Sequence, residues 1–163
     1  HHNLTFRVLA SLDRSSHQFN ISIIVNSSFF SIKKVNNFIN KLHHRVDVYY
    51  DVDSLYHYLL NSDIVVTAGG IAHLERMCLG VPGIVINQTV RQVELSKRIM
   101  AKGATLDLGL YNQVSENTIL KSFMALVRDL SWRRRMSKIS RQLVDGKGLV
   151  RIARIINSAV KAN

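Results

Sequence analysis

Short apolar runs alternate with longer amphipathic stretches along almost the whole chain, and this alternation is the feature that most restricts the fold. Five runs have strand length and are rich in β-branched residues: 21–25, 46–50, 64–67, 83–86 and 104–107. Runs such as Ile64-Val65-Val66 are apolar throughout, as is typical of strands covered on both faces. Strands that alternate with helices form parallel sheets. The sequence therefore predicts an α/β domain with a doubly wound parallel sheet.

The stretches between these runs have helical spacing. In the stretch 32–42, for example, Ile32, Val35 and Ile39 fall on one side of a helix. Helices are predicted at 4–12, 32–42, 54–60, 70–79, 90–102, 115–129, 131–144 and 148–161. Asp53 is the expected N-cap of the third helix. A doubly wound domain normally opens with a strand, whereas this chain opens with a helix. We therefore expect residues 1–163 to be one domain that lacks its first strand, cut from a two-domain parent.

The net charge of +11 is concentrated near the C-terminus. Residues 128–163 carry ten Lys and Arg against two acids, whereas the other residues carry twelve against nine. Such a segment suits nucleic acid, an anionic membrane surface or a phosphorylated ligand, and it also occurs on solvated helix faces. The densest basic run, at 131–136, has no clear interleaving of aromatic residues. Nucleic acid is therefore the less favoured partner.

Several classes of protein are disfavoured by composition. No apolar run reaches the length of about 18 residues that a membrane span needs. The helical opening of the chain is unlike a secretory leader. The single cysteine, Cys78, excludes an internal disulfide and is typical of the cytoplasm, which is the expected location. His43 and His44 are expected to point apart and His57 stands alone, so no metal site and no cofactor are predicted.

One segment, 63–75, joins a strand, a Gly-Gly turn and the start of a helix. Gly69 and Gly70 allow the backbone to turn tightly and to approach a ligand without a Cβ in the way. The first amides of the following helix point outward at its positive end, which favours an anion such as phosphate. Glu75 lies one turn further, where a carboxylate suits the hydroxyls of a ribose. A Gly-Gly turn alone also has a purely structural interpretation.

Further motifs follow this segment: Leu79-Gly-Val-Pro82, an apolar strand, a glutamine-bearing loop and, near the C-terminus, Asp145-Gly-Lys-Gly148. Together they resemble the C-terminal domain of GT-B nucleotide-sugar enzymes. The resemblance is closest to the UDP-sugar hydrolase of pseudaminic acid biosynthesis and the spore-coat polysaccharide biosynthesis proteins, which are related to the peptidoglycan-lipid N-acetylglucosaminyltransferase. It covers about residues 4–156. It implies the Rossmann-like C-terminal half of a GT-B fold, followed by C-terminal helices.

The resemblance also implies a binding site for a UDP-sugar. The residues expected at the diphosphate are Gly69, Gly70, Ile71, Ala72 and Arg91. Glu75 is expected at the ribose and Gln92 at the sugar. His73 is a further candidate at the sugar because it lies in the first turn of the ligand-facing helix, where exposure to solvent or packing is the alternative. The uracil is expected at Tyr50, Asp51 and Val52. No catalytic residue is assigned, because the family's water-activating histidine belongs to an N-terminal domain that this chain lacks.

Two departures from the family bear on the substrate. Ile71 and Ala72 stand where the family has Ser or Thr, which leaves only backbone amides for the phosphate. Arg91 stands where the family has asparagine, and an arginine there offers a charge-assisted bond. The expected function is UDP-sugar binding within a nucleotide-sugar hydrolase of surface polysaccharide or nonulosonic acid biosynthesis, and the isolated chain is expected to be inactive. The alternatives are a glycosyltransferase domain, or a non-catalytic module that binds nucleic acid through its basic C-terminal helices.

Overall fold

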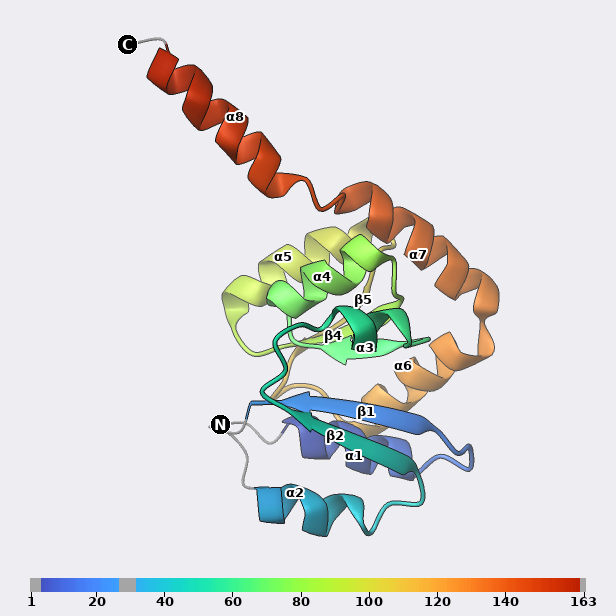
Figure 1. Ribbon diagram of the computed structural model, residues 1–163. Helices are drawn as coiled ribbons and strands as arrows, with labels where there is room; N and C mark the ends of the chain where they lie inside the picture. The colour runs from blue at the N-terminus through green and yellow to red at the C-terminus, as the bar shows by residue number, and fades with distance from the viewer. Residues whose placement is uncertain (1–3, 27–31, 162–163) are drawn as a thin grey trace.

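The structure is a computed structural model that describes residues 4–26 and 32–161. Within these residues the chain forms eight helices and five strands (Figure 1). In chain order these are α1 (Leu4–Asp13), β1 (Asn20–Val25), α2 (Ile32–Ile39), β2 (Arg45–Tyr50), α3 (Tyr56–Leu60), β3 (Val65–Thr67), α4 (Ile71–Leu79), β4 (Gly83–Asn87), α5 (Val90–Ala101), β5 (Leu106–Leu110), α6 (Glu116–Arg128), α7 (Leu130–Leu143) and α8 (Gly148–Lys161). Every helix and strand predicted from the sequence is therefore present.

Two local predictions are wrong. The last strand, predicted at 104–107, is displaced toward the C-terminus because Ala104 is bonded to helices: its amide donates to Ile99 O at 3.4 Å and its carbonyl accepts from Ser140 Oγ at 2.9 Å. Asp53 does not cap α3. The helix begins later, and Ser54 Oγ accepts the Tyr56 amide at 3.2 Å instead.

The strands form two parallel ladders instead of one continuous sheet. Strand β1 pairs with β2, and a separate ladder has the order β3-β4-β5. In the doubly wound order 3-2-1-4-5-6, the first strand lies in the middle of the sheet, between the second and the fourth. In this chain the two ladders are separate, so the prediction of a single sheet is wrong.

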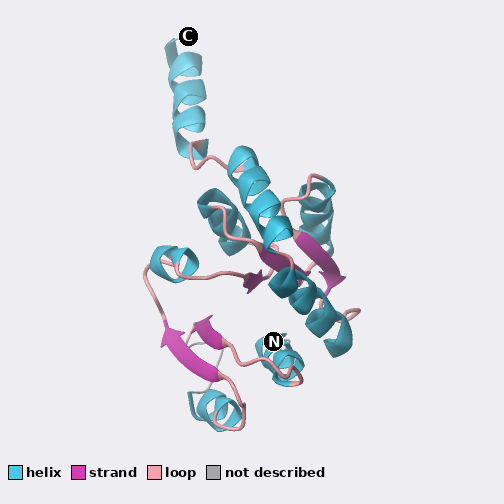
Figure 2. Cartoon of the chain, turned by 90° about the vertical axis from the view of Figure 1, so that its right-hand side faces the viewer, coloured by secondary structure: helices cyan, strands magenta, loops and turns pink. Residues whose placement is uncertain are grey.

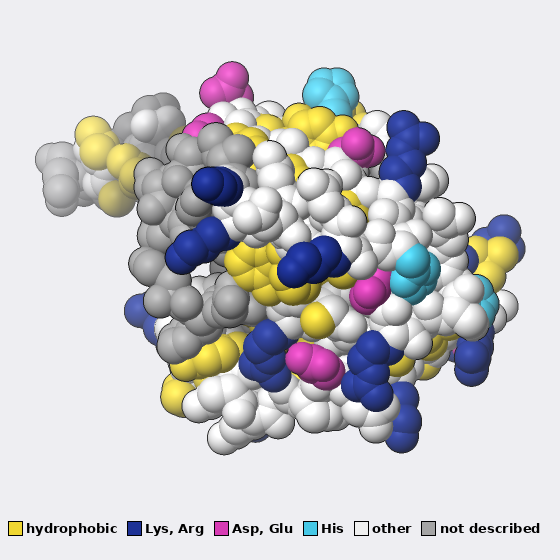
Figure 3. Space-filling model, turned by 90° about the horizontal axis from the view of Figure 1, so that it is seen from below, with side chains coloured by type: hydrophobic (Ala, Val, Ile, Leu, Met, Phe, Trp, Pro, Cys, Tyr) yellow, Lys and Arg dark blue, Asp and Glu magenta, His cyan; other side chains and the backbone are white. Residues whose placement is uncertain are grey.

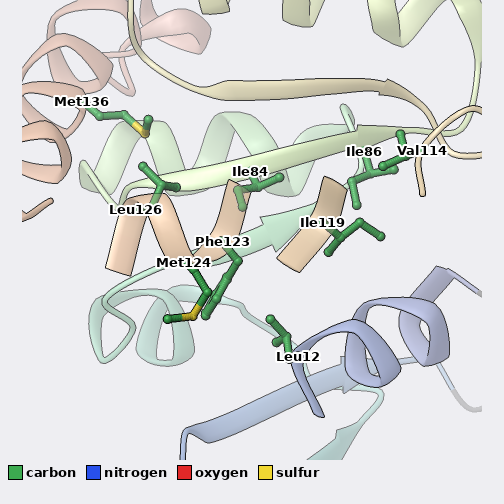
Figure 4. Packing of buried hydrophobic residues seen from close by; sticks show 9 residues of the cluster. All are labelled: Leu12, Ile84, Ile86, Val114, Ile119, Phe123, Met124, Leu126 and Met136. Atoms are coloured by element: carbon green, nitrogen blue, oxygen red, sulfur yellow. The ribbon is translucent and has the colours of Figure 1, made fainter. Parts of the chain in front are cut away.

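One hydrophobic core joins the two ladders. Its nine buried residues come mainly from β4, α6, α1 and α7: Leu12, Ile84, Ile86, Val114, Ile119, Phe123, Met124, Leu126 and Met136 (Figure 4). Ile21 of β1 and Val66 of β3 both pack against this cluster. Every residue of β4 is buried, as expected for a strand with neighbours on both sides and helices on both faces. A smaller cluster is formed by Leu9 of α1 with Ile23 and Val25 of β1, and Phe38 and Ile39 of α2 pack against it.

Helix α8 extends away from the rest of the chain (Figures 1 and 2). Its large apolar side chains are between 50% and 83% exposed: Leu149, Val150, Ile152, Ile155, Ile156 and Val160. Their spacing places most of them on one side of the helix, opposite Arg151 and Arg154. Helix α8 is therefore an amphipathic helix whose apolar side is uncovered within the described residues. None of the described helices has the length and apolarity that a membrane span requires.

Candidate functional site

The residues predicted to bind a ligand follow the carboxyl ends of strands. The arrows of β1 and β3 point to the same side of the molecule in Figure 1, and β2 is parallel to β1. The segment 50–52 follows β2 and the segment 69–72 follows β3, so both lie on that side. Ligands of open α/β sheets bind outside the carboxyl ends of the strands. The topology therefore brings these two predicted segments to the edge where such ligands bind.

The Gly-Gly turn leads directly into α4. Gly70 is the N-cap residue of this helix, and as a glycine it has no side chain that could cap the helix. Gly70 is exposed, and the side chain of Ile71 is 76% exposed. The amides of the first turn of a helix have no partner within the helix, and they favour an anion. The start of α4 thus has the properties of a phosphate site.

Gly69 is packed too closely for any side chain. A Cβ on Gly69 would lie 2.2 Å from Asn87 Oδ1 and 3.1 Å from Gln92 Cβ. Real Cβ atoms essentially never come closer than 3.0 Å to another heavy atom. Glycine at this position therefore lets the turn pack directly on the end of β4 and the start of α5.

Gln92 lies beside this turn, as the predicted site requires. Its Oε1 accepts the Gln88 amide at 2.8 Å, and its own amide donates to Thr89 Oγ1, which caps α5, at 3.3 Å. Its Nε2 lies 4.0 Å from the place that a Cβ on Gly70 would occupy. Because Oε1 is already bonded, the Nε2 donor group remains for a ligand at the start of α4.

Glu75 and Arg91 are both exposed, Glu75 in the second turn of α4 and Arg91 in the first turn of α5. Neither forms an ion pair in the part of the chain that the structure describes. Both helices begin at the same edge, because Gly69 packs against Gln92. The side chains of Glu75 and Arg91 are therefore both accessible from solvent, and the helices that carry them begin at this edge.

The segment predicted to bind uracil leaves the β1–β2 ladder with an unusual backbone. Asp51 has φ 50°, in the left-handed region that non-glycine residues seldom adopt. Its amide donates to Val25 O at 3.0 Å. The Tyr50 hydroxyl is buried and has no hydrogen-bond partner within the described chain, whereas Asp51 is exposed and Val52 partly buried. The segment therefore offers both backbone and side-chain groups at the edge.

The position of His73 does not fit its predicted contact with the sugar. Its side chain has no exposed surface, and Nδ1 lies 3.0 Å from Arg76 Nη2. Burial, together with the nearby Arg76 charge, lowers the pKa of His73 to about 3, so the ring is neutral near pH 7. His73 lies on the interior side of α4, and helical periodicity alone did not indicate this.

Arg76, which the sequence did not single out, connects three parts of the fold from inside. It is fully buried; Nη1 donates to Val81 O at 2.8 Å and Nη2 to Thr105 Oγ1 at 2.6 Å. Burial lowers its pKa to about 10, so it stays charged at neutral pH. A Cβ on Gly83 would lie 2.8 Å from Arg76 Nε and 2.4 Å from Val65 O. Glycine at 83 thus provides the space for this arginine and fixes α4 relative to β4 and β5.

A second group missed by sequence reasoning lies beneath the turn. Asn87 Nδ2 donates to Asp107 Oδ1 at 2.7 Å and to Ser96 Oγ at 2.8 Å. Ser96 Oγ donates to Asp107 Oδ2 at 2.8 Å, and the Gly109 amide donates to Asp107 Oδ1 at 2.8 Å. The sequence contained a signal for this group, because a polar residue ends the apolar run of each of two neighbouring strands. Such residues meet at one edge of a parallel sheet.

Away from this edge, three side chains that could bind a metal ion also lie close together. Asp13, His43 and His44 offer ligand atoms within 4.8 Å of one another. The rings of His43 and His44 lie 4.0 Å apart, so the expectation that they point apart is wrong. His43 Nδ1 is paired with Asp13 Oδ1 at 2.8 Å, and His44 Nδ1 accepts the Phe19 amide at 3.4 Å. Each of the three residues thus already forms a hydrogen bond or an ion pair, and the absence of a bound metal stays a prediction.

The basic face of α7 borders a shallow hollow of about 570 Å³ near the amino ends of β3 and β4. It is lined by Ser62, Asp63, Pro82, Leu130, Arg133, Arg134, Ser137, Lys138, Arg141 and Gln142. Arg141 Nε donates to Leu79 O at 3.2 Å, and Arg133 Nη1 donates to Val127 O at 2.7 Å. Two of the four cations thus hold α7 against the fold, as expected for a helix that packs back on the domain.

The comparisons with known proteins agree with the predicted resemblance. No family model matches the chain. Over 95 residues the chain is 36% identical to the spore coat polysaccharide biosynthesis protein SpsG of Bacillus subtilis (strain 168). The match covers 58% of this chain and 28% of that protein. The chain therefore spans well under half of the relative that it matches, and the predicted resemblance to the spore-coat polysaccharide proteins is confirmed.

Solved structures share the fold. The crystal structure of MurG from Acinetobacter baumannii superposes with a TM-score of 0.79 at 11% identity, covering 93% of this chain and 45% of that chain. The spinosyn rhamnosyltransferase SpnG complexed with thymidine diphosphate gives a TM-score of 0.67 at 19% identity, covering 84% and 35%. The predicted fold class, a Rossmann-like half of a GT-B fold, is confirmed.

Proposed function

We propose that this chain, which has the fold of the C-terminal half of GT-B enzymes, binds the nucleoside diphosphate part of a nucleotide sugar. The site lies at the carboxyl ends of β2, β3 and β4. The observation that carries the proposal is the uncapped start of α4, where Gly69 packs against Gln92 and Asn87. A longer parent protein that acts in polysaccharide biosynthesis would supply the rest of the enzyme, as the similarity to SpsG suggests.

In this proposal, each part of the nucleotide meets a suitable group. The diphosphate lies at the amides of Gly70, Ile71 and Ala72, which the macrodipole of α4 makes favourable for negative charge. Gln92 Nε2 donates from one side of that position. The exposed guanidinium of Arg91 adds a charge-assisted bond to a phosphate oxygen.

The nucleoside occupies the remaining part of the same edge. Glu75 accepts hydrogen bonds from the ribose hydroxyls, for which a carboxylate is a strong acceptor. The base lies toward the segment 50–52, where the Asp51 backbone leaves the ladder. The finer proposal is UDP as the nucleotide and hydrolysis as the reaction of the parent; transfer of the sugar to an acceptor is its alternative.

Titration of the 163-residue chain with UDP tests the proposal. Isothermal titration calorimetry and amide NMR spectra should show binding, with the largest shifts at residues 69–72 and 92. Glu75→Ala should remove most of the UDP binding. The control variant Glu94→Ala removes an exposed acid of α5 and should leave UDP binding unchanged. Thymidine diphosphate, which lacks the 2′-hydroxyl, should lose less affinity on Glu75→Ala than UDP does. If millimolar UDP produces neither heat nor shifts, this function is wrong for the chain.

Nucleic acid is the second candidate, and the hollow beside α7 is the observation that favours it. Arg134 and Lys138 line it without an ion pair in the described residues. Figure 3 shows the molecule from below, and on that face Lys and Arg side chains are interspersed with acidic and hydrophobic ones, so that face has no continuous basic surface. Binding of a 20-base single-stranded DNA at low salt, with affinity that falls steeply as salt rises and does not depend on Glu75, would favour this candidate.

A further inference from the structure

Three polar side chains from three elements meet beneath the Gly69-Gly70 turn: Asn87 at the end of β4, Ser96 in α5 and Asp107 in β5. Asn87 and Ser96 have no exposed surface. All three lie near the carboxyl edge of the β3-β4-β5 ladder. They contact the Gly-Gly turn and α5, which belong to the proposed nucleotide site. The group lies behind the proposed site, with Asn87 and Ser96 fully buried and Asp107 partly buried.

The hydrogen bonds fix the orientation of the Asn87 amide. Both Nδ2 hydrogens are used, one toward Ser96 Oγ and one toward Asp107 Oδ1, so the Oδ1 atom must face the other way. That atom is buried without a hydrogen-bond partner within the described residues, and a Cβ on Gly69 would lie 2.2 Å from it. Asp107 therefore determines, through Asn87, how closely the turn approaches β4.

The same group also holds the second helix of the site. Ser96 lies about two turns into α5, and its Oγ donates to Asp107 Oδ2 at 2.8 Å. Asp107 is itself held by the Gly109 amide at 2.8 Å, and Gly109 has φ 86°, which favours glycine. One carboxylate thus ties the start of α5, which carries Arg91 and Gln92, to the turn that leads into α4.

We propose that Asn87, Ser96 and Asp107 are positioning residues of the nucleotide site. They hold the Gly-Gly turn and the first turn of α5 at the relative placement that a diphosphate requires. The inference rests on the proposed function, since it concerns the same site. A buried hydrogen-bond network of this kind fixes one arrangement of the segments more sharply than apolar packing does.

The test compares UDP affinity with stability in matched variants. Ser96→Ala and Ser140→Ala each remove a hydroxyl from a fully buried serine on a helix; Ser140 Oγ bonds to Ala104 O at 2.9 Å, outside the network. Both should lower the melting temperature by similar amounts. Only Ser96→Ala should also weaken UDP binding, by on the order of tenfold, because a displaced helix start misplaces its donors. Asp107→Ala should weaken it at least as much.

The Asp107→Asn variant distinguishes a positioning role of this side chain from an effect of its negative charge. The asparagine Oδ1 can still accept from Asn87 and Gly109, and its Nδ2 can donate to Ser96 Oγ, whose own hydrogen then turns to Val93 O at 3.2 Å. The network persists, so UDP affinity should stay within about twofold of the original chain. If Asp107→Asn loses binding as Asp107→Ala does, the carboxylate charge matters and the positioning role is overturned.

The two proposals fail in different ways. If the original chain does not bind UDP, the proposed function fails and the positioning role fails with it. If the original chain binds UDP and Ser96→Ala and Asp107→Ala bind equally well, only the positioning role is overturned. Loss of affinity in Ser140→Ala equal to that in Ser96→Ala would also overturn it, because the effect would then follow stability alone.

Discussion

Replacement of Gly69 by alanine should destabilise the chain strongly, whereas the same change at the neighbouring Gly70 should not. A Cβ on Gly69 would lie 2.2 Å from Asn87 Oδ1, and at least 3.0 Å is needed, so the turn or the asparagine must move. On Gly70 the nearest atom to a Cβ is Gln92 Nε2, at 4.0 Å, and φ is −101°. The two adjacent glycines therefore differ in the space around them.

The size of the loss in unfolding free energy depends on which atoms move to make room for the new Cβ. Overpacking of this kind costs about 1–3 kcal/mol. If Asn87 moves instead, its bonds to Ser96 and Asp107 weaken, at about 1 kcal/mol each. We therefore expect Gly69→Ala to lower the free energy of unfolding by roughly 2–4 kcal/mol, which is a fall in melting temperature of roughly 5–15 °C. Gly70→Ala should cost less than about 1 kcal/mol.

Urea denaturation of four chains provides the assay: the original, Gly69→Ala, Asn87→Ala and the double variant. Asn87→Ala removes the obstructing oxygen, so Gly69→Ala should cost much less in that background. We expect a coupling energy of about 1–2 kcal/mol between the two changes. Additive losses, or a Gly69→Ala variant as stable as Gly70→Ala, would refute the close contact on which the site geometry depends.

Three further predictions concern other parts of the fold. Gly83→Ala should reduce stability by roughly 2–4 kcal/mol in urea denaturation, because a Cβ there would lie 2.4 Å from the Val65 carbonyl oxygen, which is backbone and cannot rotate away. His73 has a pKa lowered from 6.5 to about 3 by burial first and the Arg76 charge second, so its contribution to stability is complete above pH 6.5 and is lost as pH falls toward 3. His73→Gln should flatten the loss of melting temperature over that window, and an unchanged slope would contradict the burial of a neutral ring. Removal of residues 148–163 should leave the melting temperature within about 1 °C in differential scanning calorimetry, since the described side chains of α8 are all exposed; a large fall would mean that α8 is covered in solution.

Much of the fold was evident from local patterns. The alternation of apolar runs and helical stretches predicted every strand and helix, because burial of a strand on both faces leaves no polar positions within it. The Gly-Gly turn and the start of the helix after it were also evident, because backbone geometry at such a junction depends mainly on residues close in sequence. The anion site at this helix start stays a prediction. The position of Gln92 beside Gly70 came from the family resemblance instead of periodicity.

Other features depended on contacts between residues far apart in sequence. His73 and Glu75 are two residues apart on one helix, yet one is fully buried and the other exposed, because only the packed sheet decides which side of α4 faces inward. Asn87 and Asp107 are 20 positions apart in the sequence, and their direct hydrogen bond exists only once β4 and β5 pair.

The sequence by itself determined the fold class and the glycine turn that leads into α4, since both arise from short-range patterns of apolar and glycine residues. The tertiary structure decided the division of the sheet into two ladders, the burial of His73 and Arg76, and the polar network beneath Gly69. The physical reason is that hydrogen bonds and close contacts are specific to pairs of atoms. Periodicity in one segment gives no information about the other member of such a pair.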